Sequence, residues 1–278
     1  MTRLGLIAGG GGLPVALAQQ CAAAGRPLYV IRLKGFADPA LLSYEGAEIG
    51  LGELGRCFEL LHAAGCGAVC FAGKVSRPDF SALKPDRRGL AALGGVILAA
   101  RKGEDAILRH LLGLFEQEGF RVEGAHEVSG GLKLAEGALG RLSPGPDDLE
   151  DVAHGFRVAG EIGRMDIGQG VVACRGLILA VEAQEGTDAM LARCAGLPRN
   201  VRGDESSRKG VLVKRAKPTQ EERMDLPTIG VATIEGAAKA GLAGVVGEAG
   251  RSLLVDGSAV IAAADRLGLF LYGHKEAE

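Results

Sequence analysis

Four consecutive glycines that close an apolar run constrain the fold of this chain more than any other feature. Residues 3–8 form a largely apolar run, followed by Gly9–Gly12 and then by Pro14 at the start of a segment with helical spacing. Proline suits the first turn of a helix, because the N–H group it lacks has no partner within the helix there. A strand, a tight turn and a helix in this order are typical of the beginning of a parallel α/β sheet.

The alternation of strands and helices continues as far as residue 72. Gly25 and Gly65 follow the two helical segments, and glycine readily adopts the left-handed conformation that ends a helix. Helices of this length between strands predict a parallel sheet with right-handed crossovers. The predicted strands are 3–8, 28–33, 47–49 and 68–72, and the predicted helices are 14–24 and 54–64.

The second half of the chain has a different pattern, which predicts a second α/β domain with a mixed sheet. Segments 170–174 and 176–183 are apolar runs joined at a glycine, which predicts a hairpin. The run SPGPDD at 143–148 has the composition of a linker. We therefore expect an N-terminal domain over 1–130, a linker over 131–146 and a C-terminal α/β domain over 147–278.

Charge and cysteine usage narrow the classes of function. The net charge is −2 and Trp is absent, so neither a basic field nor aromatic platforms favour nucleic-acid binding. The six Cys form no C-x-x-C pair, and residues 1–12 read as a strand and not as a signal peptide. These features predict a reducing, cytoplasmic compartment.

The longest apolar run of the first half lies at 89–100. It is too short to span a bilayer, and it lies between Arg87–Arg88 and Arg101–Lys102. A run of this length is typical of a buried core helix or of an interfacial helix. We expect the core helix, with a lipid-contacting surface helix as the alternative.

Gly10, Gly11 and Gly12 are candidate phosphate-binding residues. A glycine turn between a strand and a helix presents backbone N–H groups at the positive end of the helix dipole. The dinucleotide fingerprint requires a third glycine where this chain has Pro14, and an acid near the end of the second strand, where it has Arg32. The turn therefore disfavours NAD and leaves open another phosphate or a tight turn without a ligand.

Lys74 and Arg77 are candidates in the loop GKVSRPDF at 73–80. This loop leaves the C-terminal end of a predicted parallel strand, where open α/β sheets bind their ligands. Both cations are able to pair with phosphate oxygens. A solvated loop without a ligand is the alternative.

The run VEAQEGTD at 181–188 contributes four further candidates. Glu182 and Asp188 are carboxylates of the kind that hold a hard cation, and Gln184 and Thr187 lie beside them. Strand alternation places Glu182 and Gln184 on the same face. The alternative is a capped helix, in which Thr187 is the cap and the acids complement the helix dipole.

Lys214, Lys217 and Asp225 complete the candidate set. They lie in KRAKP at 214–218 and MDLPTIG at 224–230. Cleavage of a pyrophosphate requires neutralisation of phosphate charge, an acid that holds a cation or orients water, and basic groups for the leaving phosphate. Asp-Leu-Pro is also typical of an extended lead into a helix that begins at Pro227.

Six strings along the chain together resemble one family, the UDP-2,3-diacylglucosamine pyrophosphatases of the LpxI type. The resemblance extends in order over essentially the whole chain. The strings are IAGGGGLPV, GKVSRPDF, GAHEV, IGRMDIGQG, AVEAQEGTDAML and MDLPTIGVATIEGAAKAGLAGVVGEAG.

The resemblance implies a Rossmann-like N-terminal domain, a C-terminal domain peculiar to the family and a homodimer. It also implies magnesium-dependent hydrolysis of UDP-2,3-diacylglucosamine to UMP and 2,3-diacylglucosamine 1-phosphate, by water attack on the β-phosphorus. The acid of the family's D-x-P-T-I-G motif maps onto Asp225, as metal ligand or catalytic acid/base. We expect Glu182 and Asp188 as further metal ligands and peripheral contact with the inner membrane.

Two other functions are compatible with the same residues. A nucleotide-sugar oxidoreductase or epimerase would use the N-terminal fold and bind NAD(P) tightly. A non-catalytic lipid or nucleotide carrier would bind without turnover and would tolerate Asp225→Ala.

Overall fold

The computed structural model describes residues 1–76, 83–218 and 221–275 and divides the chain into two compact units. The first unit consists of Met1–Gly131 and Glu221–Asp225, and the second of Leu132–Gln220 and Leu226–Glu278. The short segment Glu221–Asp225 therefore belongs to the first unit, although the chain on both sides of it belongs to the second.

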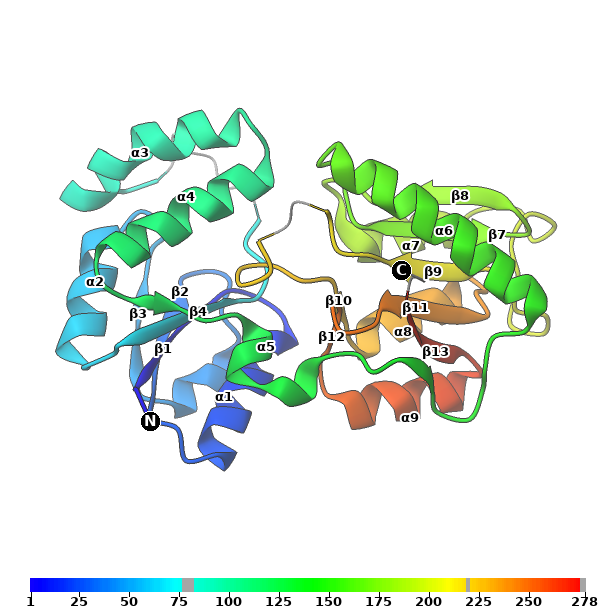
Figure 1. Ribbon diagram of the computed structural model, residues 1–278, viewed down its shortest axis with the longest axis horizontal. Helices are drawn as coiled ribbons and strands as arrows, with labels where there is room; N and C mark the ends of the chain where they lie inside the picture. Colours follow the sequence, from blue (N-terminus) through cyan, green and yellow to red (C-terminus); the bar gives the residue numbers. More distant parts are fainter. Residues whose placement is uncertain (77–82, 219–220, 276–278) are drawn as a thin grey trace. The chain divides into compact units, whose positions relative to one another are not determined.

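The first unit contains a five-stranded sheet with the order β3-β2-β1-β4-β5, in which every pairing is parallel (Figure 1). This confirms the parallel α/β sheet predicted from the alternation of strands and helices. Successive strands are added on one side of β1 as far as β3 and then on its other side from β4 onward. The strands are β1 (Leu4–Ala8), β2 (Leu28–Leu33), β3 (Gly46–Ile49), β4 (Ala68–Ala72) and β5 (Arg121–Val122).

Helices α2 and α4 cover one face of this sheet. Strand residues Ile7 and Val69 belong to the same buried cluster as Phe58 of α2 and Phe115 of α4, and the two rings meet edge to face with centroids 4.9 Å apart. Helix α1 packs against β1 and β2. The helices of this unit are α1 (Gly12–Ala23), α2 (Leu54–Ala63), α3 (Arg87–Ala100), α4 (Glu104–Gln117) and α5 (Ala125–Val128). Two short 3-10 helices, η1 (Pro39–Ser43) and η2 (Gly130–Leu132), complete the list.

Helix α3 is not the core helix that its apolar composition predicts. It packs on α2 and α4 (Figure 1), and none of its residues is buried. Arg88 anchors it through an ion pair with Glu118 at 2.6 Å, and its guanidinium lies over the Phe58 ring. The prediction of a buried helix was wrong, because the apolar composition of a short run does not indicate whether the helix packs on the sheet or on the outside of other helices. No helix in the described part of the chain is long and apolar enough to cross a membrane.

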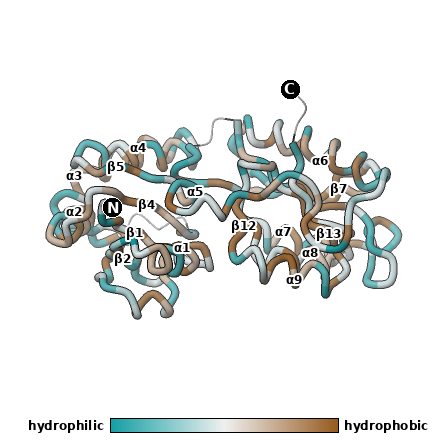
Figure 2. Tube along the Cα trace, turned by 60° about the horizontal axis from the view of Figure 1, so that its bottom comes forward, coloured by the Kyte–Doolittle hydropathy of each residue, from teal (hydrophilic) through white to brown (hydrophobic). Residues whose placement is uncertain are grey.

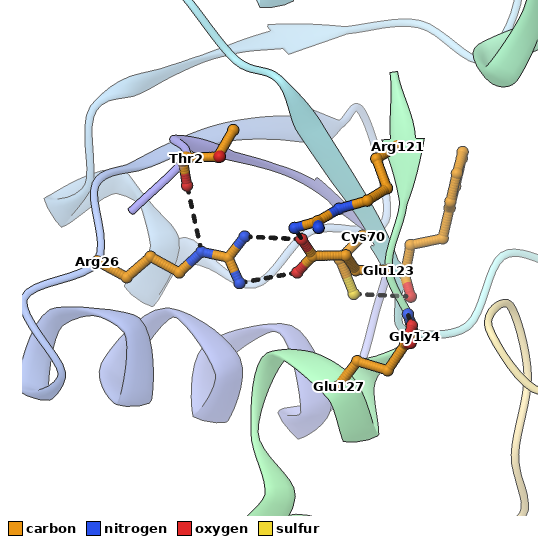
Figure 3. A network of polar contacts seen from close by, with 8 residues as sticks. Thr2, Arg26, Cys70, Arg121, Glu123, Gly124 and Glu127 are labelled. Carbon is orange, nitrogen blue, oxygen red and sulfur yellow. Dashed lines mark hydrogen bonds and ion pairs between the residues drawn. The ribbon is translucent and has the colours of Figure 1, made fainter. Parts of the chain in front are cut away.

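A buried ion pair connects the chain before β2 to the chain after β5. Arg26 donates two hydrogen bonds to the Glu123 carboxylate, at 2.8 and 3.0 Å, and Arg121 donates a third (Figure 3). Burial raises the pKa of Glu123, but the bonds from Arg26 and Arg121 outweigh it, so the pKa lies below its usual range. Buried charges are tolerated when they are paired in this way.

The second unit contains a six-stranded mixed sheet with the order β6-β13-β11-β9-β7-β8. Strands β9, β11 and β13 are parallel, whereas β7 is antiparallel to both β8 and β9. The predicted mixed sheet and the predicted hairpin are both confirmed. The strands are β6 (Gly137–Leu139), β7 (Gly170–Cys174), β8 (Leu177–Val181), β9 (Val211–Lys214), β11 (Gly244–Glu248) and β13 (Phe270–His274), and a separate parallel pair is formed by β10 (Thr228–Ile229) and β12 (Leu253–Leu254). The segment 131–146, expected as a linker, contributes β6 to the sheet.

Helices cover both faces of this sheet. Val171 and Val213 pack with Phe156 of α6 in one cluster, whereas their chain neighbours Val172 and Leu212 belong to another cluster, with α7, α8 and α9. Because successive strand residues point to opposite faces, α6 lies on one face and the other three helices on the other. Figure 2 shows brown and teal stretches alternating along these helices, as expected for elements with one buried side. The helices are α6 (Pro146–Arg164), α7 (Gly186–Ala195), α8 (Val231–Lys239) and α9 (Gly257–Leu267).

Candidate functional site

The carboxyl ends of parallel strands in the second unit bring two of the predicted residues together. Strand β8 runs parallel to β9, because both are antiparallel to β7. Glu182 follows β8, and Lys214 is the last residue of β9. Gly170 of β7 lies between them, since it pairs with Lys214 and its carbonyl accepts from the Glu182 N–H at 2.8 Å. This edge is where open α/β sheets place their ligands.

A buried chain of hydrogen bonds joins three of the candidates. Lys214 Nζ donates to Thr187 Oγ1 at 3.0 Å, and Thr187 Oγ1 donates to Glu182 Oε1 at 2.7 Å. All three residues are buried. The ammonium and the carboxylate are therefore linked through one hydroxyl, which is able to accept from one and donate to the other. The alternative role of Thr187 as a helix cap is wrong, because the N-cap of α7 is Glu185 and no side chain forms a cap bond there.

The same ammonium also fixes the TIG part of the family-like motif. Lys214 Nζ donates to the Thr228 carbonyl at 2.9 Å. Thr228 begins β10, and Gly230 is the N-cap of α8. Lys214 therefore holds β9, α7 and the β10–α8 connection at one point of the second unit.

Two glycines of the string IGRMDIGQG make room for Glu182. A Cβ on Gly170 would lie 2.5 Å from Glu182 Oε2, and a Cβ on Gly168 would overlap the Glu182 carbonyl. Oε2 is buried and has no hydrogen-bond partner within the described residues. A buried carboxylate oxygen without a partner is unusual and is a feature of functional sites.

Asp166 and Glu248 belong to this edge but were not predicted. Lys217, a predicted residue, is buried and forms an ion pair with Asp166 at 2.6 Å. Asp166 has a φ of 54°, in the left-handed region that few non-glycine residues occupy. Glu248, the last residue of β11, accepts from the Ala216 N–H at 3.1 Å. The signal that identifies Glu248 is its place at the end of a parallel strand beside β9.

The remaining candidates of the run 181–188 are exposed, unlike the three residues of the buried chain. Gln184 is exposed. Asp188 is exposed too, and it lines a groove between α7 and α8 together with Leu191 and Ala232. Within the described ranges, no group of three or more His, Cys, Asp or Glu residues is placed to hold a metal ion.

In the first unit, the glycine turn follows β1, the strand at which the order of strand addition reverses. Gly10 and Lys74 exchange backbone hydrogen bonds of 2.8 and 2.9 Å, which joins the end of β1 to the loop after β4. A Cβ on Gly9 would lie 2.8 Å from the Lys74 carbonyl, so only glycine fits there. Gly11 is the N-cap of α1, with a φ of 90° and no side-chain cap bond. Gly12 begins the helix, and the loop residue Arg77 lies outside the described residues.

Arg32, which weighs against NAD in the sequence, has an internal role. Its guanidinium donates to the carbonyls of Leu41 and Tyr44, at 3.3 Å each. It therefore connects β2 to the chain around η1. The side chain still takes the place of the acid in the dinucleotide fingerprint.

Asp225 belongs to the first unit, at the end of a segment that is held by charged residues. The Asp225 N–H donates to the Glu221 carbonyl at 3.1 Å. Arg223 pairs with Glu221 at 2.9 Å and with Glu116 of α4 at 2.8 Å, and the bond from Arg223 lowers the pKa of Glu221. Asp225 is half-buried. Because Glu182 and Asp188 belong to the second unit, the metal-ligand set that combines them with Asp225 stays a prediction.

Comparison with known proteins gives a consistent result over nearly the whole chain. The model of the LpxI N-terminal domain matches residues 3–132, and the model of the LpxI C-terminal domain matches residues 135–272. A protein of Caulobacter vibrioides named UDP-2,3-diacylglucosamine pyrophosphatase LpxI is 63% identical over 273 residues, which cover 98% of each chain.

Among solved structures, the CobK precorrin-6A reductase is 13% identical with a TM-score of 0.37. The match covers 100% of this chain and 89% of that one. A similarity at this level has no bearing on function.

Proposed function

The chain belongs to the LpxI family, and on this premise we propose that it hydrolyses UDP-2,3-diacylglucosamine to UMP and 2,3-diacylglucosamine 1-phosphate in lipid A biosynthesis. The observation that carries the proposal is the 63% identity to the Caulobacter pyrophosphatase over 98% of both chains. Identity at this level over the full length supports retention of the reaction, whereas a shared fold alone would not.

In the proposed reaction, water attacks the β-phosphorus and UMP leaves. The bond that forms joins the water oxygen to the phosphorus that carries the sugar, and the bond that breaks is the one to the bridging oxygen. Lys214 and Lys217 supply positive charge at the carboxyl edge of the second sheet. Charge that is fixed before the reaction stabilises the transition state of phosphoryl transfer without reorganisation.

Asp225 is the proposed acid that orients the water or binds the metal, by its place in the family motif. The uncapped N–H groups of Gly11 and Gly12 and the cations Lys74 and Arg77 are proposed to hold phosphate. Support comes from the N-terminus of α1, which no side chain caps and which follows β1, where the strand order of the first sheet reverses.

Magnesium is the proposed cofactor, and the chemistry of one residue fits it. The partnerless Oε2 of Glu182 is a hard carboxylate oxygen. Magnesium takes few protein ligands, because one or two carboxylates and the substrate phosphates suffice. Glu182 is the ligand that this observation supports, and Asp225 and Asp188 remain ligands predicted from the sequence. When bound, the metal would neutralise charge on the pyrophosphate.

We further propose a cytoplasmic homodimer. The location is supported by the six cysteines, which are all free and buried, as is usual in a reducing compartment. The dimer rests on the family resemblance alone. Sedimentation velocity at several protein concentrations tests it, and a monomer at every concentration would refute it.

The position of attack is tested by hydrolysis in ¹⁸O-labelled water. Attack on the β-phosphorus places the label in 2,3-diacylglucosamine 1-phosphate, whereas attack on the other phosphorus places it in UMP. Mass spectrometry of both products distinguishes the two. Label in UMP would contradict the proposed site of attack but not the hydrolysis.

A further inference from the structure

Helix α3 presents an unusual surface to solvent. Apart from Arg88, its exposed positions recur with helical spacing and form one stripe along the helix. In most helices of water-soluble domains such a stripe is polar, but here its middle is apolar. The stripe consists of Arg87, Leu90, Ala91, Gly94, Ile97, Leu98 and Arg101.

The leucines of the stripe are more exposed than apolar side chains of this size usually are. Leu90 is 63% exposed and Leu98 is 62% exposed, with Ile97 between them in the stripe at 38%. Contiguous exposed apolar residues rimmed by polar ones are typical of an interaction surface.

Charge indicates what kind of surface the stripe would meet. Arg87 and Arg101 are exposed at its two ends, and Lys102 follows. The helix itself contains no acidic residue. Leu98 and Lys102 also line a shallow pocket of about 310 Å³ between α3 and α4, so a cation lies beside the apolar stripe as well as at its ends. Apolar side chains between cations fit the boundary between headgroups and acyl chains in an anionic bilayer.

We propose that the exposed stripe of α3 docks this protein on an anionic lipid surface, with the helix lying in the plane of the interface. The inner side of α3 stays on α2 and α4 through the Arg88–Glu118 ion pair. The inference deepens the proposed function and rests on it for its purpose, because a substrate with two acyl chains resides in a membrane.

Vesicle co-sedimentation tests the proposal with the full chain. Wild type should bind vesicles of phosphatidylcholine mixed with phosphatidylglycerol and bind pure phosphatidylcholine vesicles far less. The double variant Leu90→Gln/Leu98→Gln should bind about tenfold more weakly or worse. The variant Arg87→Gln/Arg101→Gln should lose about fivefold per cation, and added salt should reduce the difference.

Leu42→Gln is the matched control, since Leu42 is 69% exposed in the same unit but away from the stripe. It should bind the mixed vesicles as wild type does. Absence of wild-type binding, or equal binding by the Leu90/Leu98 variant, would overturn the proposal. A changed oligomeric state of that variant without changed vesicle binding would also overturn it, because a second copy of the chain would then cover the stripe.

Turnover distinguishes failure of the docking surface from failure of the proposed function. The Leu90/Leu98 variant should hydrolyse detergent-dispersed substrate at the wild-type rate and vesicle-embedded substrate more slowly. Vesicle binding without any wild-type turnover would refute the proposed function and leave the docking surface intact.

Discussion

Replacement of Thr187 by valine tests whether the buried chain from Lys214 to Glu182 is the organising element of the second unit. Valine has nearly the same shape as threonine but cannot accept from Lys214 Nζ or donate to Glu182 Oε1, bonds of 3.0 and 2.7 Å. Each bond joins a charged group, and such a bond contributes about 1.5–3 kcal/mol. We expect Thr187→Val to lower the free energy of unfolding by about 3 kcal/mol or more.

Thr233→Val is the matched control. Thr233 is also a buried threonine, in the first turn of α8, but its Oγ1 accepts from the uncharged Gly230 N–H, at 3.3 Å, and among the described residues it bonds no charged group. Its loss should cost about 1 kcal/mol. The measurement is urea unfolding followed by far-UV circular dichroism, because the chain has no Trp to report by fluorescence. Equal losses for the two variants would refute the reasoning, since the hydroxyl of Thr187 would then not bridge two charges.

Three further predictions follow from the geometry. Gly170→Ala places a Cβ 2.5 Å from Glu182 Oε2, so we expect a loss of about 1–3 kcal/mol in the same unfolding assay; a neutral effect would show that Glu182 moves freely. Arg26→Met leaves the Glu123 carboxylate buried with its main partner removed, so we expect a loss of about 3–5 kcal/mol in unfolding free energy. The same substitution at Arg164, whose ion pair is exposed, should cost under about 1 kcal/mol. The pKa of Glu123 is lowered in the folded state, so its stabilisation is complete above the unfolded pKa of about 4.3 and is lost as the pH falls through the lower folded pKa. Glu123→Gln should therefore lose less stability than wild type across this acid range. Equal losses of unfolding free energy with falling pH in the two proteins would contradict the assignment.

Local patterns in the sequence were sufficient for the elements and for part of the candidate site. The glycine turn before Pro14 and the apolar runs at 170–174 and 176–183 predict a helix start and a hairpin, because these depend on neighbouring residues only. Glu182 was identified from its place at the end of an apolar run and Lys214 from the basic string KRAKP, and the parallel strands bring the two together.

Features that depend on distant residues were not predictable in this way. Thr187 reads as a helix cap from its neighbours, but its hydroxyl is held by Lys214, which lies 27 residues later in the chain. Segment Glu221–Asp225 joins the first unit because Arg223 pairs with Glu116, and no local pattern indicates such a partner. The exposure of α3 depends on which helices lie between it and the sheet.

Release of UMP from UDP-2,3-diacylglucosamine is the most direct test of the central claim, that this chain is a metal-assisted pyrophosphate hydrolase with Asp225 in its site. The assay compares wild type with Asp225→Asn, each with magnesium and with EDTA, after circular dichroism has established that both are folded. We expect release by wild type with magnesium, loss of release with EDTA, and a loss of at least about a hundredfold in the variant. A folded wild-type protein that releases no UMP would contradict the claim, and full activity of Asp225→Asn would remove Asp225 from the site.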